Sequence, residues 1–202
     1  MFHDGSRTLQ DRFDTRRVAD RIDELLVKDT ISESDRQFIE RADMFFLATA
    51  DEHGHPNCSY KGGDPGFVHA LDEQTIAFPN YDGNGMYLSM GNISVNPQVG
   101  LLFIDFEKGH RLRLNGTAIL DSSEDLLAGW PEAQFVIRVR ATEVFPNCPR
   151  YIHRYELVRR SSFVPRPDRK TPVPSWKRSD WAVDTLPAED AATDPTREVL
   201  DR

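Results

Sequence analysis

The sequence has 202 residues, of which 39% are hydrophobic and 29% charged, and its formal net charge is −8 at pH 7. A chain of this length can bury one sizeable core, and its acidic balance argues against a nucleic-acid partner, which would require a basic face. No apolar run approaches the length of a membrane span, and the charged first thirty residues contain no secretion signal. We therefore expect a cytoplasmic protein with no membrane partner.

Two helices are predicted at the start of the chain. Residues 11–28 place apolar side chains on roughly one helical face, namely Phe13, Val18, Ile22, Leu25 and Leu26. A second, shorter helix is expected to start near Ser34, capped either by Ser32 with Asp35 or by Ser34 with Gln37. We expect both helices to pack against the rest of the domain or against a partner subunit.

A series of short strands follows, separated by regular turn signals. The candidate strands cover residues 44–50, 57–61, 67–71, 75–79, 99–104, 111–120 and 134–144, with a short helix at 84–94. The continuous apolar run at 99–104 indicates a central strand buried on both faces. Gly116 interrupts an alternating strand and indicates a β-bulge. This spacing predicts a mainly β fold, either a barrel or a sandwich.

The last part of the chain is rich in proline. Six of the thirteen prolines follow Arg160, so no regular element is expected there. Phe163, Trp176 and Trp181 are too apolar for a free tail and predict an extended arm that lies on the barrel or on a neighbour. The predicted regions are N-terminal helices at 1–42, the barrel at 43–160, the arm at 161–188 and a disordered tail at 189–202.

Neither the cysteines nor the histidines form a recognisable metal site. Cys58 and Cys148 are ninety residues apart, and no Cys-x-x-Cys pattern occurs. His53 and His55 flank Gly54 in a turn, but no cysteine or carboxylate cluster joins them. We therefore expect no bound metal. The nucleophile-elbow and zinc-protease motifs of hydrolases are also absent.

Five short sequence features occur in a fixed order between residues 38 and 145. They are the run at 46–56 (FLATADEHGHP), Ser59-Tyr60-Lys61, the turn at 78–84 (FPNYDGN), the strand beginning Asn96-Pro97, and the strand at 111–118 (RLRLNGTA). This order resembles that of the pyridoxamine 5'-phosphate oxidase-like split barrels. The resemblance implies a mainly β fold with peripheral helices, an FMN-binding split barrel, and a homodimer with its flavin sites at the subunit interface.

Two departures separate the chain from the oxidase that gives this family its name. The turn carries Gly83-Asn84 where the oxidase has a Ser-x-Lys pattern, which removes one cation from the expected phosphate site. The Arg-x-His pattern that holds pyridoxal phosphate is also missing, and the stretch from Arg150 to His153 does not replace it. The resemblance therefore implies a relative that acts on another small molecule.

The resemblance also directs attention to residues that could hold flavin mononucleotide (FMN). A phosphate needs cations and hydroxyl or N–H donors, which Lys61, Arg111, Arg113, Ser59 and Tyr60 could supply. The flavin ring needs backbone or amide groups near its edge. The candidates for that role are Asn80, Tyr81, Gly83, Asn84 and Asn92, and Asn84 could also favour an anion at a helix start.

Residues of the arm and of the barrel end could complete the site. Trp176 or Lys177 could reach across to the flavin of a partner subunit, and Cys148 and Arg150 could approach it from the end of the barrel. The alternative role for Cys148 is that of a small buried apolar residue. No catalytic side chain is assigned, because the flavin itself carries the hydride.

The family resemblance implies an FMN-dependent oxidoreductase. Its flavin would take a hydride from a donor such as NAD(P)H and pass electrons to an unknown small-molecule substrate. One alternative is a non-catalytic flavin carrier or sensor with the same fold. Another is a split barrel that binds the deazaflavin F420 or haem in place of FMN.

Overall fold

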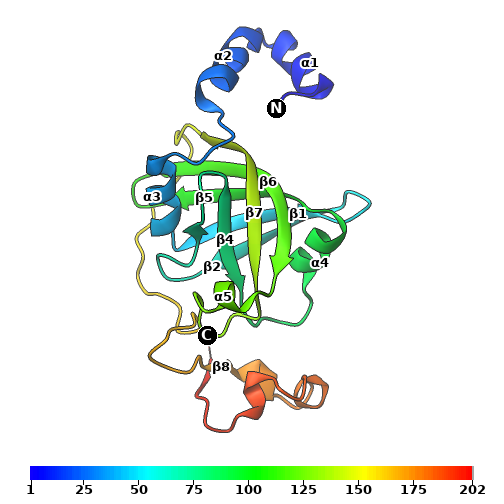
Figure 1. Cartoon of the computed structure of the whole chain (residues 1–202), viewed down its shortest axis with the longest axis vertical. Coiled ribbons are helices and arrows are strands. Elements are labelled where there is room, and N and C mark those ends of the chain that lie inside the picture. Colours follow the sequence, from blue (N-terminus) through cyan, green and yellow to red (C-terminus); the bar gives the residue numbers. More distant parts are fainter. Residues whose placement is uncertain (202) are drawn as a thin grey trace.

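The computed structural model describes residues 1–201 and is built around one antiparallel sheet (Figure 1). The seven strands of this sheet lie in the order β2-β1-β5-β6-β7-β4-β3, and all neighbours pair antiparallel. Their bounds are β1 (Met44–Ala50), β2 (Pro56–Gly62), β3 (His69–Ala70), β4 (Thr75–Asn80), β5 (Gln98–Asp105), β6 (His110–Asp121) and β7 (Phe135–Pro146). The mainly β fold predicted from the sequence is confirmed.

The sheet curls into a barrel that is left open between its two edge strands. The ring of Phe45 on β1 lies 4.9 Å from the ring of Phe78 on β4, measured between centroids. These strands stand far apart in the strand order, so the contact requires the sheet to bend round on itself. Phe45, Phe78 and Phe103 are fully buried and form the centre of the core. Because β2 and β3 stay unpaired at the edges, the result is the expected split barrel.

Two helices cover the barrel. Helix α3 (Glu33–Arg41) begins with a capping box in which Ser32 and Asp35 satisfy each other's backbone N–H groups, so the first of the two predicted caps is confirmed. The helix turns Ile39 into the core. Helix α4 (Leu88–Val95) buries Ser89, Met90 and Ile93 and packs on β1, β2 and β6, whereas the short α5 (Glu124–Leu127) lies before β7.

The first two helices differ from the sequence-based expectation. The single helix predicted over 11–28 is two helices, α1 (Asp4–Arg12) and α2 (Arg16–Leu26). The chain breaks at Asp14, which has a φ of 52° in the left-handed region that Asp tolerates. Neither helix buries a residue, and both stand away from the barrel (Figure 1). Of the N-terminal helices, α3 packs on the barrel within this chain, whereas the packing of α1 and α2 on a partner subunit stays a prediction.

The central strand β5 is buried on one face only within this chain. Val99, Leu101 and Phe103 are buried, whereas Gly100, Leu102 and Ile104 on the outer face are half-buried. The prediction of burial on both faces is thus incorrect for a single chain. By contrast, the predicted bulge at Gly116 is confirmed, since the register between β6 and β7 shifts between Asn115 and Gly116.

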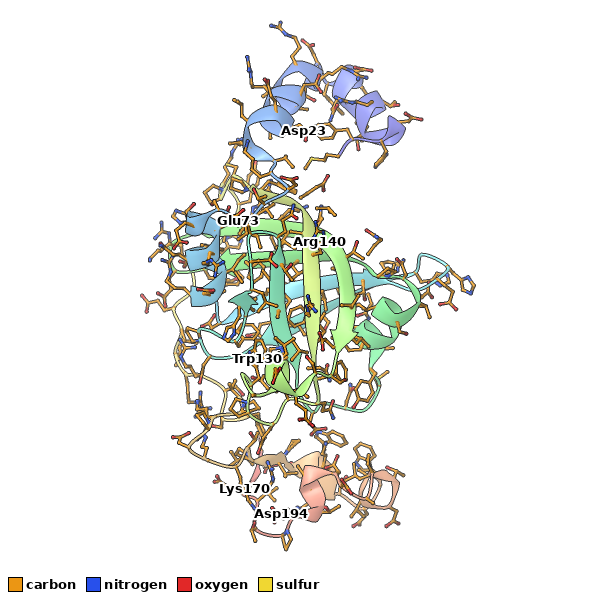
Figure 2. The ribbon with its side chains drawn as sticks, viewed as in Figure 1. Asp23, Glu73, Trp130, Arg140, Lys170 and Asp194 are labelled. Carbon is orange, nitrogen blue, oxygen red and sulfur yellow. The ribbon has the colours of Figure 1, made fainter. Side chains whose placement is uncertain are left out.

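The last part of the chain forms a small irregular unit beside the barrel (Figure 1). It contains β8 (Val173–Pro174), three 3₁₀ turns, η1 (Ser175–Arg178), η2 (Val183–Thr185) and η3 (Ala191–Thr193), and β9 (Val199–Leu200), which pairs parallel with β8. Lys170 Nζ donates to a carboxylate oxygen of Asp194 at 2.7 Å (both labelled in Figure 2). Residues 189–201, expected to be disordered, therefore fold back on the arm, and residue 202 lies outside the described part.

Among residues 1–201, no helix combines the length and the apolar character that crossing a membrane would need.

Candidate binding site

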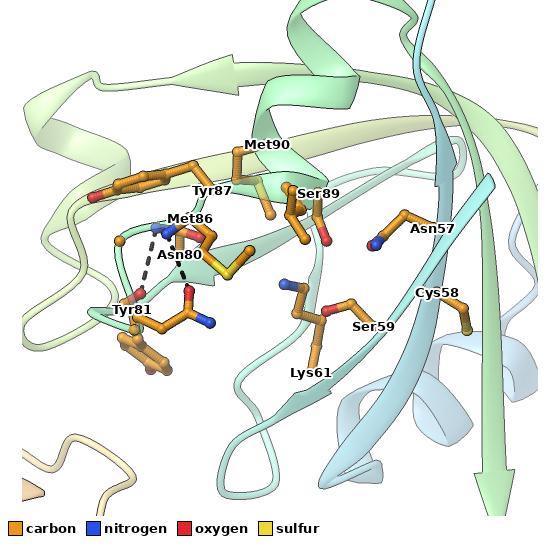
Figure 3. A pocket seen from close by; sticks show the side chains of 14 residues that line it. Asn57, Cys58, Ser59, Lys61, Asn80, Tyr81, Met86, Tyr87, Ser89 and Met90 are labelled. Atoms are coloured by element: carbon orange, nitrogen blue, oxygen red, sulfur yellow. Dashed lines mark hydrogen bonds between the residues drawn. The ribbon is translucent and has the colours of Figure 1, made fainter. Parts of the chain in front are cut away.

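A pocket of about 350 Å³ opens between the edge strand β2 and the segment that leads from β4 into α4 (Figure 3). We call residues 81–87, which join β4 to α4, the pocket loop. The pocket lies at the gap of the split barrel, because β2 is one edge of the sheet and β4 is next to the other edge. It gathers six of the eleven predicted cofactor-binding residues: Ser59, Lys61, Asn80, Tyr81, Gly83 and Asn84.

Strand β2 supplies the polar wall of the pocket. Residues that pair directly across an antiparallel sheet share a face. Lys61 pairs with Phe45 and Ser59 with Leu47, and both partners are fully buried in the core. Lys61 and Ser59 therefore point to the inner face, toward the pocket (Figure 3).

Lys61 is the cation of this wall. Its side chain is half-buried, and among residues 1–201 its ammonium group has neither an ion-pair partner nor a hydrogen-bond partner. Burial lowers the pKa of Lys61, because removal from water disfavours the charged form. An anion placed in the pocket would restore the lost solvation of this ammonium group. The geometry thus suits Lys61 to an anionic ligand.

The opposite wall is formed by the pocket loop and the start of α4. Gly85 has a φ of +75° and Tyr87 a φ of 48°, so two left-handed residues turn the chain sharply into the helix. Gln134 Oε1 accepts hydrogen bonds from Asn80 Nδ2 at 2.8 Å and from the Tyr87 hydroxyl at 2.9 Å. Asn84 Oδ1 accepts from the backbone N–H of Met86 at 3.1 Å. These bonds fix the loop at its two ends.

Sequence reasoning missed several residues that line the pocket. Met86 and Leu88 are more than half exposed, and together with Tyr87 and Met90 they give this wall an apolar surface suited to a flat ring. Asn57 continues the inner face of β2 two residues before Ser59. The alternation of a strand could have identified Asn57 from Ser59 and Lys61, whereas the apolar wall lies in and beside the helix expected at 84–94, where the sequence analysis assigned no binding role to apolar residues.

The structure does not bring Tyr60, Arg111 or Arg113 to this pocket within one chain. Tyr60 pairs with Phe46, Phe46 with Leu102, and Leu102 with Arg113, so this row lies on the outer face of the sheet. The Tyr60 ring packs edge-on against Phe46 at 6.1 Å between centroids. The Arg111 guanidinium, on the same face as Arg113, donates to the Cys148 carbonyl at 2.8 Å. The expected cluster of three phosphate cations is thus divided between two faces.

Asn92 and Trp176 also lie outside the pocket lining. The Asn92 amide donates to the Thr49 hydroxyl at 3.0 Å, which joins α4 to β1. Trp176 belongs to η1 and stacks on Trp181, with 5.6 Å between ring centroids and an interplanar angle of 13°. Trp181 is 71% exposed, so this pair presents a flat apolar surface to solvent. Within one chain, therefore, both residues serve other contacts.

The remaining candidates from the sequence lie on the surface. Cys148 is exposed and unpaired, so it is not the small buried residue that was considered. Hydrogen bonds from Arg150 lower the pKa of the Cys148 thiol. His55 Nδ1 lies 2.8 Å from an Asp51 carboxylate oxygen. Among residues 1–201, no three histidine, cysteine or carboxylate side chains gather at a single point.

The chain matches one family model and resembles several solved structures. A family model described as pyridoxamine 5'-phosphate oxidase matches residues 31–158, which is more than half of the chain. None of the curated proteins matches it in sequence.

Several solved structures are similar to the chain. HupZ from Group A Streptococcus is 19% identical over 58% of this chain and 99% of its own, with a TM-score of 0.48. An FMN-binding protein from Syntrophomonas wolfei is 14% identical over 70% of this chain and 97% of its own, with a TM-score of 0.44. HutZ, the heme storage protein from Vibrio cholerae, is 18% identical over 55% of this chain and 89% of its own, with a TM-score of 0.39.

Proposed function

The chain belongs to the pyridoxamine 5'-phosphate oxidase-like family, and we propose that it binds FMN in the pocket between β2 and the pocket loop and acts as an oxidoreductase. The observation that carries this proposal is the half-buried ammonium group of Lys61, which faces the pocket without a partner among residues 1–201. A ligand that combines an anionic group with a flat ring fits both walls of the pocket.

The polar wall suits the phosphate of FMN. Lys61 would provide a charge-assisted hydrogen bond, and the Ser59 hydroxyl two residues away on the same face would provide a neutral one. The apolar side chains of Met86, Leu88 and Met90 would face the isoalloxazine ring. Glycines in the pocket loop would allow backbone groups to approach the ring edge closely. The residues present are therefore compatible with FMN.

Bound FMN would supply a hydride acceptor, which we propose is reduced by NAD(P)H and reoxidised by a small-molecule substrate. The residues of the chain would bind the phosphate, hold the ring and exclude water from one of its faces. The proposed location is the cytoplasm. In support of a reducing compartment, both cysteines are unpaired and exposed.

We further propose that the protein is a homodimer with residues of both subunits at each flavin. The outer face of β1, β2, β5 and β6 carries the half-buried Leu102 and Ile104 and the Tyr60 side chain, which is 62% exposed. A partner subunit on this face would bury the second side of the apolar run in β5. It would also let Tyr60 and Arg113, which face away from their own pocket, reach that of the partner.

A non-catalytic flavin carrier or sensor is the second candidate. One observation favours it: among the described residues that line the pocket there is no histidine and no carboxylate that could move a proton. Such a protein would use Lys61 and Ser59 in the same way. The two candidates differ only in whether the bound flavin is reduced by a nicotinamide.

The identity of the bound molecule is the decisive measurement. The purified protein should be yellow, and denaturation should release a compound with the mass of FMN. A colourless protein that does not bind added FMN would contradict both the oxidoreductase and the carrier. Release of F420 or haem would assign the pocket to that cofactor instead. If FMN is present, anaerobic titration with NADH and NADPH should bleach it, whereas no bleaching with either donor favours the carrier.

A further inference from the structure

The C-terminal segment is tied to both sides of the pocket by basic side chains. We call residues 160–201 the strap. The Arg166 guanidinium donates two hydrogen bonds to the Asp64 carboxylate, at 2.6 and 2.9 Å. Lys177 Nζ donates to an Asp82 carboxylate oxygen at 2.6 Å. Asp64 follows β2 at the polar wall, and Asp82 lies in the pocket loop, so one segment holds both walls.

The ammonium group of Lys177 is the more deeply buried of these two anchors. Only 3% of its side chain is exposed, and its Nζ also lies 2.7 Å from Asp190, which is 6% exposed. Burial acts to lower the pKa of Lys177, but the hydrogen bonds that Lys177 donates to Asp190 and Asp82, together with the negative charges of these carboxylates, outweigh it and raise the pKa. A buried ammonium group is stable only when carboxylates compensate it. The ion pair with Lys177 therefore holds Asp82 against the strap.

Within the strap, the carboxylate of Asp190 is held in place by a hydrogen bond besides the one from Lys177. The Asp190 carboxylate caps η3 by accepting from the backbone N–H of Ala192 at 2.8 Å. Lys170, elsewhere in the strap, pairs with Asp194 and Thr196 and so reinforces the strap internally. The strap thus has its own internal structure and uses Lys177 as its link to the pocket loop.

The glycines of the pocket loop face open space. A β-carbon added at Gly83 or Gly85 would meet no atom within 4 Å, so no packing contact on that side holds this part of the loop. Hydrogen bonds from Asn80 to Gln134 and to the Tyr81 carbonyl hold the loop at its β4 end, and the Asn84–Met86 turn and the Tyr87–Gln134 hydrogen bond hold it near α4. Between these two ends, the loop is held by the Asp82–Lys177 ion pair. Between β4 and Asn84, Asp82 is the residue through which the strap fixes the loop.

We propose that the strap sets the position of the pocket loop and thereby the shape of the binding pocket, with Lys177 as the positioning residue and Asp82 as its partner in the loop. The effect of the strap on ligand affinity rests on the proposed binding of FMN. The effect of the strap on the position of the pocket loop does not depend on that proposal. The strap lines no part of the pocket and would act on it through the loop alone; it also lies outside residues 31–158, which the family model matches.

Two variants test this proposal from opposite sides of the ion pair. Lys177→Met removes the cation, and Asp82→Asn removes the charge of the loop while leaving Lys177 paired with Asp190. The second variant is the safer one, because Asp82 is 48% exposed and its loss leaves no buried charge unpaired. Lys170→Met is the matched control, since the hydrogen bonds of Lys170 go to Asp194 and Thr196 of the strap itself.

The readouts are hydrogen exchange of the backbone amides at residues 81–87 and the dissociation constant for FMN. Both ion-pair variants should speed this exchange roughly tenfold, with exchange in β5–β7 unchanged, and should weaken FMN binding, whereas Lys170→Met should do neither. Unchanged exchange at 81–87 in a folded Asp82→Asn protein would overturn the proposal. A wild-type protein that binds no FMN would refute the proposed function alone, and the exchange comparison would still decide the role of the strap.

Discussion

The backbone of Gly116 passes so close to the carbonyl oxygen of Arg140 that a β-carbon on Gly116 would lie only 2.2 Å from it. This approach occurs at the bulge where β6 and β7 shift register. Glycine is therefore required there by the neighbouring backbone, which cannot move aside as the end of a flexible side chain could. The bulge in turn lets the long strands β6 and β7 bend around the core.

Replacing Gly116 by alanine should therefore destabilise the fold. We expect Gly116→Ala to lower the free energy of unfolding by about 1–3 kcal/mol, the usual cost of overpacking, as measured by urea denaturation. Gly83→Ala is the control, because a β-carbon there meets nothing within 4 Å. Its effect should stay within about 0.5 kcal/mol. Equal free energies of unfolding for the two variants would show that the bulge accommodates a β-carbon at residue 116 without loss of stability.

The affinity for FMN should depend on Lys61. Removing the ammonium group in Lys61→Ala should weaken FMN binding by roughly 1.5–3 kcal/mol, the range for a charge-assisted hydrogen bond to a phosphate. Fluorescence quenching of added FMN measures this change. Lys108→Ala, in the exposed turn between β5 and β6, serves as the control and should bind as the wild type does. The same affinity in both variants would reject Lys61 as the phosphate anchor.

The outer face of the sheet should control assembly. Tyr60→Glu places a charge on the face proposed to meet the partner, so it should shift the protein from dimer to monomer in sedimentation velocity experiments. Tyr151→Glu, at a tyrosine that is 85% exposed near the end of the barrel, provides a matched control and should leave the dimer intact. A monomeric wild-type protein would contradict the proposed homodimer directly.

Arg113 gives an independent test of the same arrangement. Its side chain shares the outer face with Tyr60 and cannot line the pocket of its own chain. If it reaches the flavin of a partner, Arg113→Ala should weaken FMN binding in the dimer and have no effect in a Tyr60→Glu background. An equal loss of affinity in both backgrounds would mean that Arg113 acts within its own subunit.

The attachment of the strap should depend on pH at both extremes. Burial raises the pKa of the Asp190 carboxyl, but the hydrogen bonds from Lys177 and from the Ala192 N–H, together with the positive charge of Lys177, outweigh it and hold the pKa below its usual value. The pKa of Lys177 is raised. The Asp190 contribution is therefore present above the usual carboxyl pKa of about 4 and lost as the pH falls through its lowered value. The Lys177 contribution is present below the usual lysine pKa of about 10.4 and lost as the pH rises through its raised value.

Tryptophan fluorescence can report this dependence. Trp176 lies close to the ion pair, since Lys177 Nζ is 5.8 Å from the centre of its ring. The emission of the wild type should stay constant across the neutral range and change at the acid and alkaline ends. The Lys177→Met variant should lack both of these changes. Identical profiles for the two proteins would show that the changes arise from the barrel as a whole.

Local features of the fold could be read from the sequence. The alternation of residues in β6 and β7, the break at Gly116 and the Ser32–Asp35 capping box depend on neighbouring residues in the chain, and the structure confirms them. The order of motifs along the barrel was likewise sufficient to identify the split barrel.

The division of the site between two faces could not be predicted in this way. Whether Lys61 and Arg113 share a face depends on the register between β1, β2, β5 and β6, and one residue of slip reverses it. The expected helix over 11–28 was misplaced because its apolar pattern does not reveal the left-handed turn at Asp14. The folded structure of residues 189–201 was missed because the strap lacks any periodic pattern, although Val199 near its end pairs with Val173.

The order in which the chain is synthesised gives the strap a further consequence. Asp82 and Lys177 are separated by 95 residues, and Asp64 and Arg166 by 102. Because chains emerge from the ribosome amino-terminus first, all seven strands of the barrel precede the strap. We expect the nascent barrel to expose an untethered pocket loop until the strap has been synthesised. A chain truncated before residue 160 would lack the strap, so its pocket loop should be less ordered than that of the full chain.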